Sequence, residues 1–589
     1  MRSSNRDNCD PKDIAIKSFF LGPQSENEAW LKEKWNLIIE NWLSWRRSRF
    51  PQDGRAVSPE DQSSPSFKNS LGILSKSVSH ILEELEQETA KFSPRYIGHM
   101  VSEISLPALL GHVCALLHNP NNTSREVSRV TSRLEEEAIQ DLAKMLGYRD
   151  EKSEGHFTSG GTVANVEAMW RAWSHLDRNL TLSILMKKQN PDVEFMNLAH
   201  LSPKHFQEAI VKYGFENQLF KESCLSQGPW HWAKVFKNAW GFDFNGPVIL
   251  VPANKHYSWK KAVALLGFGE ESLWTIELDE FGRPDLADLR RKIENAYDLK
   301  RPVLMVVSVA GTTEMGEVDP IHEVRNLLEK IEQKSGGFIW HHVDAAYGGY
   351  YTSMLYDSEL EIELGTHNVW ALKAISRTQS ITIDPHKLGY VPYSCGAIIT
   401  KNADFYQTRQ FQAPYLEHKN DSRWMHTLEG SRGGAGATAT WLSNKTLGLN
   451  ADGHGRLLSK GLEAKDLLVA EIQKHLPEVA VQTPHDLNIL CLSAGQPGGT
   501  LSEANQKTKQ IYEKFCASPN FSVSKTVLSM AKYKRLIERS CRERQMKIDT
   551  DQLFLLRLVL MNPFIVSKET TTKFVSEFVA ELKRFQDDQ

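Results

Sequence analysis

The segment TIDPHKLGYVPY, at residues 382–393, places a single lysine directly after a short apolar run and a proline. The residues Asp384-Pro385-His386-Lys387 at its centre predict a buried strand that turns sharply into a loop. Such a turn would hold the Lys387 amine inside the protein instead of in bulk water. An amine held in that way can attack a carbonyl carbon and form a Schiff base, so Lys387 is a candidate catalytic nucleophile. A lysine beside a histidine is also a common surface dipeptide, so other residues must support the chemical interpretation.

Apolar runs of the same kind lie on both sides of this segment. They are PVILVPAN at 247–254, RPVLMVVSVAG at 301–311, GFIWHHVDAAYGG at 337–349 and CGAIIT at 395–400. Continuous apolar runs separated by helical stretches are typical of a parallel sheet that helices cover on both faces, which predicts an α/β fold. Ligands of such sheets bind beyond the carboxyl ends of the strands, where we expect the candidate chemical residues to lie.

A glycine-rich segment, TSGGT at 158–162, is a candidate anion-binding site. It precedes an apolar face at helical spacing, so Gly160 and Gly161 would stand at the start of a helix. Backbone amides at a helix N-terminus can approach an anion closely, and the Thr162 hydroxyl can donate one more hydrogen bond. The same pattern is also typical of an ordinary helix cap. It is not a Walker loop, because no Gly-Lys-Ser/Thr follows.

Two further residues, Asp344 and His256, follow apolar runs. The two alanines after Asp344 would let a flat ring lie on the backbone. A buried carboxylate is costly without a cation, so burial of Asp344 predicts a protonated partner; an aspartate that caps the strand-to-loop turn is the alternative. His256, in PANKHYSW, is a candidate for stacking on a ring, although a lone histidine is more often structural. Pyridoxal phosphate needs a lysine, a carboxylate at its ring nitrogen, a phosphate cradle and a stacked group, and this chain offers all four.

Composition and charge argue against several classes of protein. The 589 residues include 70 basic and 73 acidic side chains, a net charge of −3, so nothing favours binding to nucleic acid or to an anionic membrane. Seven scattered cysteines without a CxxC pair fit a reducing cytosol better than a disulfide framework. The sequence contains no signal peptide and no apolar run near the roughly 18 residues of a membrane span, which predicts a cytoplasmic protein.

His341 and His342 would face opposite sides of a strand without a third ligand, so we predict no metal site.

The N-terminal region predicts a separate helical arm. Tryptophans and aliphatic residues recur at helical spacing over residues 26–50, up to Pro51. A second helix is predicted over 69–90, after a Pro/Ser/Asp-rich connector at 51–67. Short helices cannot bury so many aromatic side chains alone, so we expect the arm to pack on a partner subunit or on the main body. Packing within one chain only is the open alternative.

Five motifs, in this order, carry a resemblance to a known family: TSGGTVAN, ANKHYSW, SVAGTTEMGEVD, HVDAAYGGY and TIDPHKLGYVPYSCG. The chain resembles the group II pyridoxal phosphate-dependent amino acid decarboxylases, and among them most closely the bacterial tyrosine decarboxylases. The similarity runs from about Arg95 to the C-terminus and includes RYIGHMVSE, LEGSRGGAGATATW and LRLVLMNPF. It implies a fold-type I homodimer, similar to aspartate aminotransferase, with active sites shared between subunits. It also implies an arm at 1–95, a large cofactor-binding domain at 96–445 and a smaller C-terminal α+β domain at 446–589.

The resemblance also implies the roles of individual residues toward pyridoxal 5'-phosphate. Lys387 would form the Schiff base, Asp344 would lie at the pyridine nitrogen and His256 would stack on the ring. The cofactor-binding residues that it implies are Gly161, Thr162, His256, Thr312, Asp344, Ala346, His386 and Lys387. Gly161, Thr162 and His386 would hold the phosphate, and Ala346 would lie beneath the ring. His99 and Tyr393 would face the substrate.

A tyrosine further along the chain bears on the reaction type. In the tyrosine decarboxylases a tyrosine on a mobile loop follows the lysine by 28 positions, and Tyr415, in QAPYLEHK, stands 28 positions after Lys387. A phenol delivered by a closing loop can return a proton to the substrate carbon and exclude water, so Tyr415 is a candidate catalytic residue. An exposed loop aromatic is the alternative.

The expected reaction is decarboxylation of an L-amino acid to its amine and CO2. RYIGHM at 95–100 resembles the tyrosine enzymes more than the RYFNQ-type segment of glutamate decarboxylases, which favours tyrosine or a related aromatic substrate. Val101 departs from the tyrosine-enzyme pattern, as do the segments 225–245 and 520–550, and Arg557 lies in a segment shared by relatives with different substrates. Decarboxylation of glutamate or aspartate, transamination, aldehyde-forming oxidation and a non-enzymatic scaffold remain as alternatives.

Overall fold

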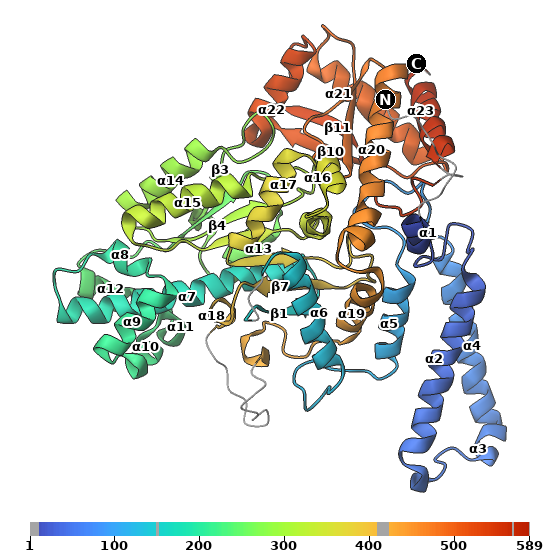
Figure 1. Ribbon diagram of the computed structural model, residues 1–589, viewed down its shortest axis with the longest axis horizontal. Helices are drawn as coiled ribbons and strands as arrows, with labels where there is room; N and C mark the ends of the chain where they lie inside the picture. The colour runs from blue at the N-terminus through green and yellow to red at the C-terminus, as the bar shows by residue number, and fades with distance from the viewer. Residues whose placement is uncertain (1–10, 149–151, 409–422, 568–570, 588–589) are drawn as a thin grey trace.

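The computed structural model describes residues 11–148, 152–408, 423–567 and 571–587 (Figure 1). Its centre is a seven-stranded sheet with the strand order β1-β7-β6-β5-β4-β2-β3. The strands are β1 (Glu154–Thr158), β2 (Val248–Pro252), β3 (Leu273–Ile276), β4 (Val303–Val309), β5 (His341–Asp344), β6 (Ser380–Ile383) and β7 (Gly396–Thr400). The five strands from β3 to β6 in this order pair in parallel, so the predicted α/β fold with a mostly parallel sheet is confirmed.

The direction of one strand differs from the prediction of a parallel sheet. The apolar run at 395–400 does form a strand, but β7 pairs antiparallel with both β6 and β1. A parallel neighbour would need a crossover that carries the chain back along the sheet, usually through a helix. The connection between β6 and β7 is the lysine segment, residues 384–395, which contains turns and no helix. The chain therefore reverses there, and the edge strand β1, which was not predicted, completes the sheet.

Alternate residues of the central strands contact two different helical layers. The helices concerned are α7 (Gly161–Gln189), α13 (Ser258–Leu265), α14 (Leu286–Asp298) and α15 (Ile321–Ser335). Ile249 and Val251 of β2 pack in one cluster with α7 and α13, whereas Val248 and Leu250 pack with α14 and α15. Successive side chains of a strand face opposite sides, so covering both faces requires a continuous apolar run.

The C-terminal part contains a second, antiparallel sheet with the strand order β10-β11-β9-β8. Its strands and helices are β8 (Val479–Val481), β9 (Ile489–Ala494), β10 (Ser524–Ser529), β11 (Gln552–Val559), α20 (Arg456–His475), α21 (Leu501–Ala517), α22 (Met530–Glu543) and α23 (Thr571–Asp587). Leu490, Leu558 and Phe578 belong to a buried layer that joins this sheet to α20, α21 and α23. The smaller C-terminal α+β unit is thus confirmed, while the boundaries at 95 and 445 stay predictions.

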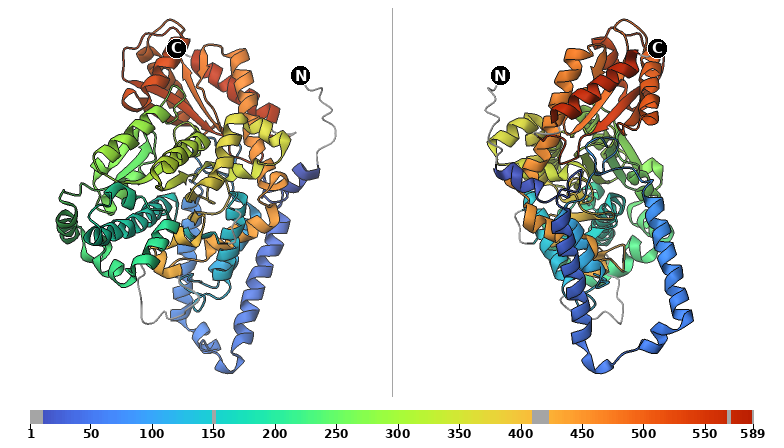
Figure 2. Two further views of the ribbon diagram at one scale, coloured as in Figure 1. Left: turned by 60° about the vertical axis from the view of Figure 1, so that its left-hand side comes forward. Right: turned by 90° about the vertical axis from the view of Figure 1, so that its right-hand side faces the viewer.

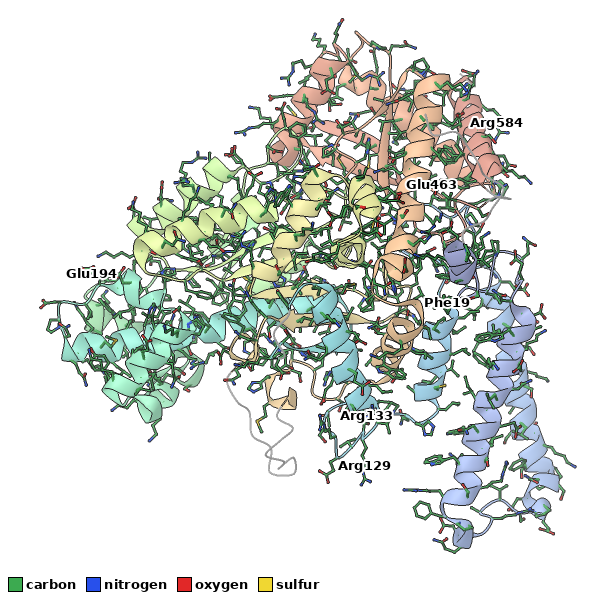
Figure 3. The ribbon with its side chains drawn as sticks, in the orientation of Figure 1. Phe19, Arg129, Arg133, Glu194, Glu463 and Arg584 are labelled. Atoms are coloured by element: carbon green, nitrogen blue, oxygen red, sulfur yellow. The ribbon has the colours of Figure 1, made fainter. Side chains whose placement is uncertain are left out.

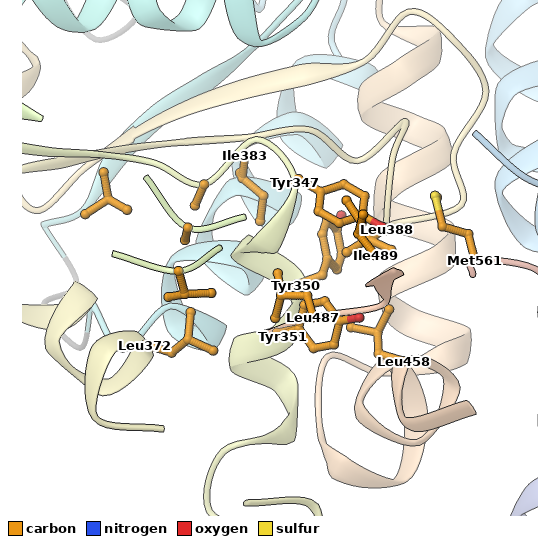
Figure 4. Close-up of a cluster of buried hydrophobic side chains, with 14 of the residues drawn as sticks. Tyr347, Tyr350, Tyr351, Leu372, Ile383, Leu388, Leu458, Leu487, Ile489 and Met561 are labelled. Atoms are coloured by element: carbon orange, nitrogen blue, oxygen red, sulfur yellow. The ribbon is translucent and has the colours of Figure 1, made fainter. Parts of the chain in front are cut away.

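A buried cluster joins the large sheet to the C-terminal part (Figure 4). Tyr351 of the 3-10 helix η3 (Gly348–Met354) belongs to it together with Leu458 of α20. The cluster also contains Ile383 and Leu388, neither of which exposes any surface. Because these two residues flank the lysine turn, packing holds that turn at the carboxyl edge of the sheet.

The remaining helices lie at the edges of the large sheet. Helices α8 (Phe195–Ala199), α9 (Pro203–Tyr213), α10 (Glu216–Glu222), α11 (Cys224–Gln227) and α12 (Pro229–Trp240) form an insertion between α7 and β2. An aromatic cluster that includes Phe195 and Phe236 holds α8 against α12. Helices α5 (Leu106–Leu116), α6 (Thr131–Met145) and α19 (Ala435–Leu447) pack together near β1. Within the described ranges, no helix is long and apolar enough to cross a membrane.

The predicted arm consists of α2 (Glu28–Arg49) and α4 (Pro65–Leu85), joined through the short α3 (Pro59–Ser63). Helix α4 begins earlier than predicted because Ser64 caps its N-terminus and a proline occupies its first position. Neither long helix buries a residue. The arm projects from one side of the molecule (Figures 2 and 3). Helix α2 still contacts the main body near the end of α5, where the ring centroids of Trp45 and His118 lie 4.9 Å apart.

Candidate active site

A cavity of about 360 Å³ lies at the carboxyl ends of β2, β4, β5 and β6. Nine of the predicted site residues line it: Gly161, Thr162, His256, Thr312, Asp344, Ala346, His386, Lys387 and Tyr393. Further residues that line it include Met100, Asn165, Asn254, Tyr257, Tyr347 and Asp384. The fold therefore brings together residues from segments that are far apart in the sequence, at the edge of the sheet where ligands were expected.

Lys387 reaches this cavity from the turn between β6 and β7. The backbone N–H of Lys387 donates to the carbonyl of Asp384 at 2.9 Å, and that of His386 donates to the carbonyl of Cys395 at 3.1 Å. These bonds confirm the predicted sharp turn. Nζ of Lys387 lies 3.2 Å from Oδ2 of the buried Asp384, and the lysine side chain is only 21% exposed.

Asp344 ends β5 with a buried carboxylate that accepts three hydrogen bonds. Its Oδ2 accepts from Nδ2 of Asn165 at 2.8 Å and from Nε1 of Trp259 at 3.3 Å. Its Oδ1 accepts from the backbone N–H of Ala346 at 3.4 Å. All three donors are uncharged, and they hold the carboxylate in place away from bulk water. A cationic ring nitrogen in the cavity would therefore be attracted to this carboxylate.

The glycine-rich segment forms the predicted start of a helix. Helix α7 begins at Gly161, and Gly160 at its N-cap has φ 156°. The backbone amides of the first helical turn have no partner within the helix, which favours an anion in front of them. A Cβ at position 161 would lie 2.9 Å from Oδ2 of Asp384, so a side chain larger than hydrogen does not fit without movement.

The comparisons with known proteins agree with this geometry. A family model described as the pyridoxal-dependent decarboxylase conserved domain matches residues 243–493. The L-tyrosine decarboxylase of Levilactobacillus brevis is 33% identical over 79% of this chain and 75% of its own length. The chain belongs to the pyridoxal-dependent decarboxylase family. The L-tyrosine decarboxylase of Enterococcus faecium is 28% identical to this chain, and the match covers 97% of this chain and 99% of the Enterococcus faecium protein. The aspartate 1-decarboxylase of Aliivibrio fischeri is 30% identical over 67% and 65%, respectively.

Solved structures share the fold of the decarboxylase. Mouse CSAD in its apo form superimposes with a TM-score of 0.61 at 19% identity, covering 85% of this chain and 86% of that one. Oryza sativa TDC with PLP and tryptamine has a TM-score of 0.61 at 15% identity and covers 95% and 97%. At these identities the likeness concerns the fold alone. The family match confirms the resemblance to pyridoxal phosphate-dependent amino acid decarboxylases, so the decarboxylase is a carboxy-lyase that uses this cofactor.

The residues of the cavity fit pyridoxal phosphate. Gly160 and Gly161 line the cavity at the start of α7 without side chains, the buried Asp344 lies at the end of β5, and Lys387 supplies an amine from the turn after β6. Among the described residues, no group of three or more His, Cys, Asp or Glu side chains is placed to hold a metal ion. His341 and His342 instead contact the hydroxyls of Ser308 and Ser380, at 2.9 and 2.8 Å.

Two histidines of the decarboxylase line the cavity in the same tautomeric form. The backbone N–H of Ser258 donates to Nδ1 of His256 at 3.3 Å, and that of Cys395 donates to Nδ1 of His386 at 3.0 Å. Burial lowers the pKa of His256 and lowers the pKa of His386 to about 3. Both rings are therefore neutral at pH 7 and carry their proton on Nε2. The His386 ring also stacks on Tyr393, with ring centroids 4.1 Å apart.

Thr312 lies on the loop after β4, and Glu317 holds it in place. The Thr312 hydroxyl donates to the Glu317 carboxyl group, and the backbone N–H of Thr312 donates to the Glu317 carbonyl at 3.0 Å. Glu317 is fully buried, and this burial raises its pKa well above the usual range. The buried Glu317 side chain therefore fixes the loop that carries Thr312 into the cavity.

Two predicted site residues, His99 and Tyr415, are not among the described residues that line the cavity. His99 is exposed and does not line the cavity, whereas its neighbour Met100 does. Tyr415 lies outside the described residues. The sequence reasoning missed Asp384, Asn165 and Trp259, although each stands inside one of the five motifs. Their presence in the motifs was the available signal, but only the fold shows which motif side chains meet at the site.

Replacing Gly161 by alanine is expected to weaken pyridoxal phosphate binding by about tenfold to 100-fold. The new Cβ would lie 2.9 Å from Oδ2 of Asp384 and 3.2 Å from Cβ of Ala346. Overpacking of this kind typically costs about 1–3 kcal/mol, and about 1.4 kcal/mol corresponds to tenfold in affinity. Titration of the apoenzyme with the cofactor measures the effect. Gly430→Ala is the control, because a Cβ there meets no atom within 4 Å; equal affinities of the two variants would contradict the prediction.

Proposed function

We propose that the decarboxylase converts L-tyrosine, or a related aromatic amino acid, into its amine and CO2. The observation that carries this proposal is the lining of the cavity: of its described residues, Lys387 is the one lysine or arginine. Met100, Tyr257, Tyr347 and Tyr393 offer apolar surface and aromatic rings to a flat side chain. The similarity to two bacterial L-tyrosine decarboxylases supports the same choice.

An acidic substrate is the second candidate, because the aspartate 1-decarboxylase of Aliivibrio fischeri is also a relative. A second carboxylate on the substrate would need a cation of its own inside the cavity. Arg557 is buried behind the lining, where its Nη1 donates to the carbonyl of Gly98 and to Oγ of Ser524, each at 3.2 Å. It does not line the cavity, which favours the aromatic substrate over the acidic one.

A product screen tests this proposal directly. The purified protein, loaded with pyridoxal phosphate, is incubated with each of the twenty amino acids, and amines, ketoacids and aldehydes are separated by mass spectrometry. Tyramine from tyrosine is expected as the fastest product. A β-alanine or γ-aminobutyrate product would overturn the aromatic assignment, and a ketoacid or an aldehyde in place of amine would indicate transamination or oxidation. An inert protein that binds the cofactor would indicate a scaffold.

The residues of the cavity have distinct roles in this proposal. When bound, pyridoxal phosphate supplies an electron sink for the electrons left by the departing carboxylate. Lys387 would hold the cofactor through Nζ, and Asp344 would keep the proton on the pyridine nitrogen. His256 would stack on the ring, and Ala346 would lie beneath it. Gly161, Thr162 and His386 would hold the phosphate, Thr312 would also bind the cofactor, and Tyr393 and His99 stay predicted substrate contacts.

Tyr415→Phe is expected to keep the cofactor but to reduce amine formation by about 100-fold or more, the scale of general acid catalysis. The reason is the family spacing from Lys387, since the phenol would deliver the proton to the substrate carbon. Amine, CO2 and abortive transamination products are measured together. Tyr356→Phe, at an exposed tyrosine that does not line the cavity, is the control. Unchanged turnover in Tyr415→Phe would remove the proton-donor role.

We also propose that two copies of the chain associate through the arm. On α4, Leu74, Val78, Ile81 and Leu85 form an apolar stripe at helical spacing, and each is about half exposed. A stripe of this length on a helix that buries nothing in its own chain is typical of an interface. The double substitution Leu74→Asp and Ile81→Asp is expected to convert a dimer into monomers in light scattering. Val211→Asp, at an exposed valine of α9, is the control; a monomeric unmodified chain would contradict the proposal.

A further inference from the structure

The cavity contains a second buried carboxylate, Asp384, in addition to Asp344. Its Oδ2 lies 3.2 Å from Nζ of Lys387 and 3.5 Å from Nε2 of His386. Its Oδ1 is buried and accepts no hydrogen bond from any described residue. A buried carboxyl oxygen without a donor is unfavourable, and no described residue donates to Oδ1, so a group bound in the cavity could be its partner.

Asp384 faces the place where the helix start would hold an anion. A Cβ on Gly161 would lie 2.9 Å from its Oδ2 and 3.2 Å from its Oδ1, and a Cβ on Gly396 would lie 2.7 Å from Oδ1. A Cβ on Gly160 would lie 3.4 Å from Cε1 of His386. Gly160, Gly161, His386 and Asp384 are thus close neighbours, and all four line the cavity at the start of α7. An ionised Asp384 would repel a phosphate placed there.

The charges around Asp384 do not remove this conflict once the cofactor is bound. Lys387 is a cation beside it, but one cation cannot balance both a carboxylate and a phosphate that carries up to two negative charges. The other titratable groups that act on it or respond to it are Asp344, His256, His386, Tyr350, Tyr393 and Cys395. The two histidines are neutral at pH 7, as shown above, and Asp344 is a second negative charge.

We propose that Asp384 is protonated when the cofactor phosphate is bound and donates a hydrogen bond from its carboxyl group to a phosphate oxygen. The proton comes from solvent, so that binding of the phosphate takes up a proton at this site. A carboxylic acid has one donor, whereas the carboxylate has none, so protonation converts a repulsive neighbour into a ligand. Burial raises the pKa of Asp384 already in the protein alone, which makes the uptake easier.

The sign of the resulting pH dependence follows from linkage. If the phosphate raises the pKa of Asp384 further, the bound state carries more protons than the free state between the two pKa values. Affinity for the phosphate must then fall as pH rises through that window, by up to about tenfold per pH unit for one linked proton. Asparagine at position 384 has the same shape and is always a donor, so its affinity should lack this dependence.

The test uses the full-length chain with Lys387→Ala, which prevents covalent attachment and removes the cation of the amine. Pyridoxamine 5'-phosphate is titrated into this variant and into Lys387→Ala/Asp384→Asn from pH 7 to 9, by calorimetry in two buffers of different ionisation enthalpy. We expect Lys387→Ala to take up about 0.5 to 1 proton more per bound ligand than the double variant at pH 7–8. At pH 9 the double variant should bind at least tenfold more tightly, although it has lost an ionisable side chain. Equal proton uptake and parallel pH profiles would overturn the proposal.

A second comparison does not depend on the asparagine variant being folded. In Lys387→Ala alone, pyridoxamine without its phosphate should bind without the extra proton, because no anion then faces Asp384. The same uptake with and without the phosphate group would overturn the proposal. The inference rests on the cofactor but not on the proposed substrate. Because binding is measured without any amino acid, failure here leaves the product screen unaffected, and the reverse also holds.

Discussion

Lys387→Ala is expected to reduce amine formation by about 10³-fold or more and to abolish covalent attachment of pyridoxal phosphate. Loss of a covalent catalytic group costs up to about 10⁶-fold in the best measured case. The structure gives the reason: Nζ of Lys387 reaches the cavity from a turn that is closed by its own backbone hydrogen bonds. Borohydride reduction followed by peptide mass mapping should place the cofactor on Lys387 in the unmodified protein and nowhere in the variant.

Lys255→Ala is a demanding control for this experiment. Burial lowers the pKa of Lys255 to about 8, and its Nζ donates to Oγ1 of Thr275 at 3.1 Å. It stands next to His256, yet it does not line the cavity. If a low amine pKa alone selected the lysine, Lys255 would carry the label. Labelling of Lys255, or full turnover after loss of Lys387, would contradict the assigned chemistry.

Asp344→Asn is expected to lower the rate of decarboxylation by about 10²–10³-fold, the scale of removing one preorganised electrostatic group from an active site. Asparagine has nearly the same shape but no charge, so it cannot keep a proton on the pyridine nitrogen. Its amide NH2 group would also face two donors if it occupied the place of Oδ2, which now accepts from Asn165 and Trp259. Steady-state turnover and the absorbance of bound cofactor, measured together, separate loss of rate from loss of binding.

Trp259→Phe provides the matched control for Asp344→Asn. It removes the longer hydrogen bond to Oδ2, at 3.3 Å, but leaves the carboxylate and the 2.8 Å bond from Asn165. A hydrogen bond to a charged group contributes about 1.5–3 kcal/mol. Because this bond is long and the carboxylate keeps its other donors, we expect the rate to fall by about tenfold, the lower end of that range. A larger effect from Trp259→Phe than from Asp344→Asn would mean that packing at Trp259, and not the charge at Asp344, limits the reaction.

Much of the fold and of the site could be predicted from local sequence. Runs such as VILVP at 248–252 are apolar at every position, and this is enough to indicate a strand covered on both faces. The order of the motifs along the chain is by itself enough to predict pyridoxal phosphate as the cofactor. The local pattern could not give the direction of β7, because both directions need the same apolar residues. A short connection without a helix decided it.

The sequence by itself determined which chemical groups are present: an amine at 387, a carboxylate at 344, a glycine pair at 160–161 and an N-terminal arm with apolar side chains. Only the tertiary structure decided which of them meet. Asn165 and Asp344 are 179 positions apart and yet share a hydrogen bond, and His99 lies outside a cavity that Met100 lines. The periodicity of apolar residues predicts which face of a helix or strand is buried, because residues of one element that share a face recur at a fixed spacing. The direction and partner of a side chain depend on how distant segments pack, and it is this packing that places Asp384 against Gly161 at the start of α7.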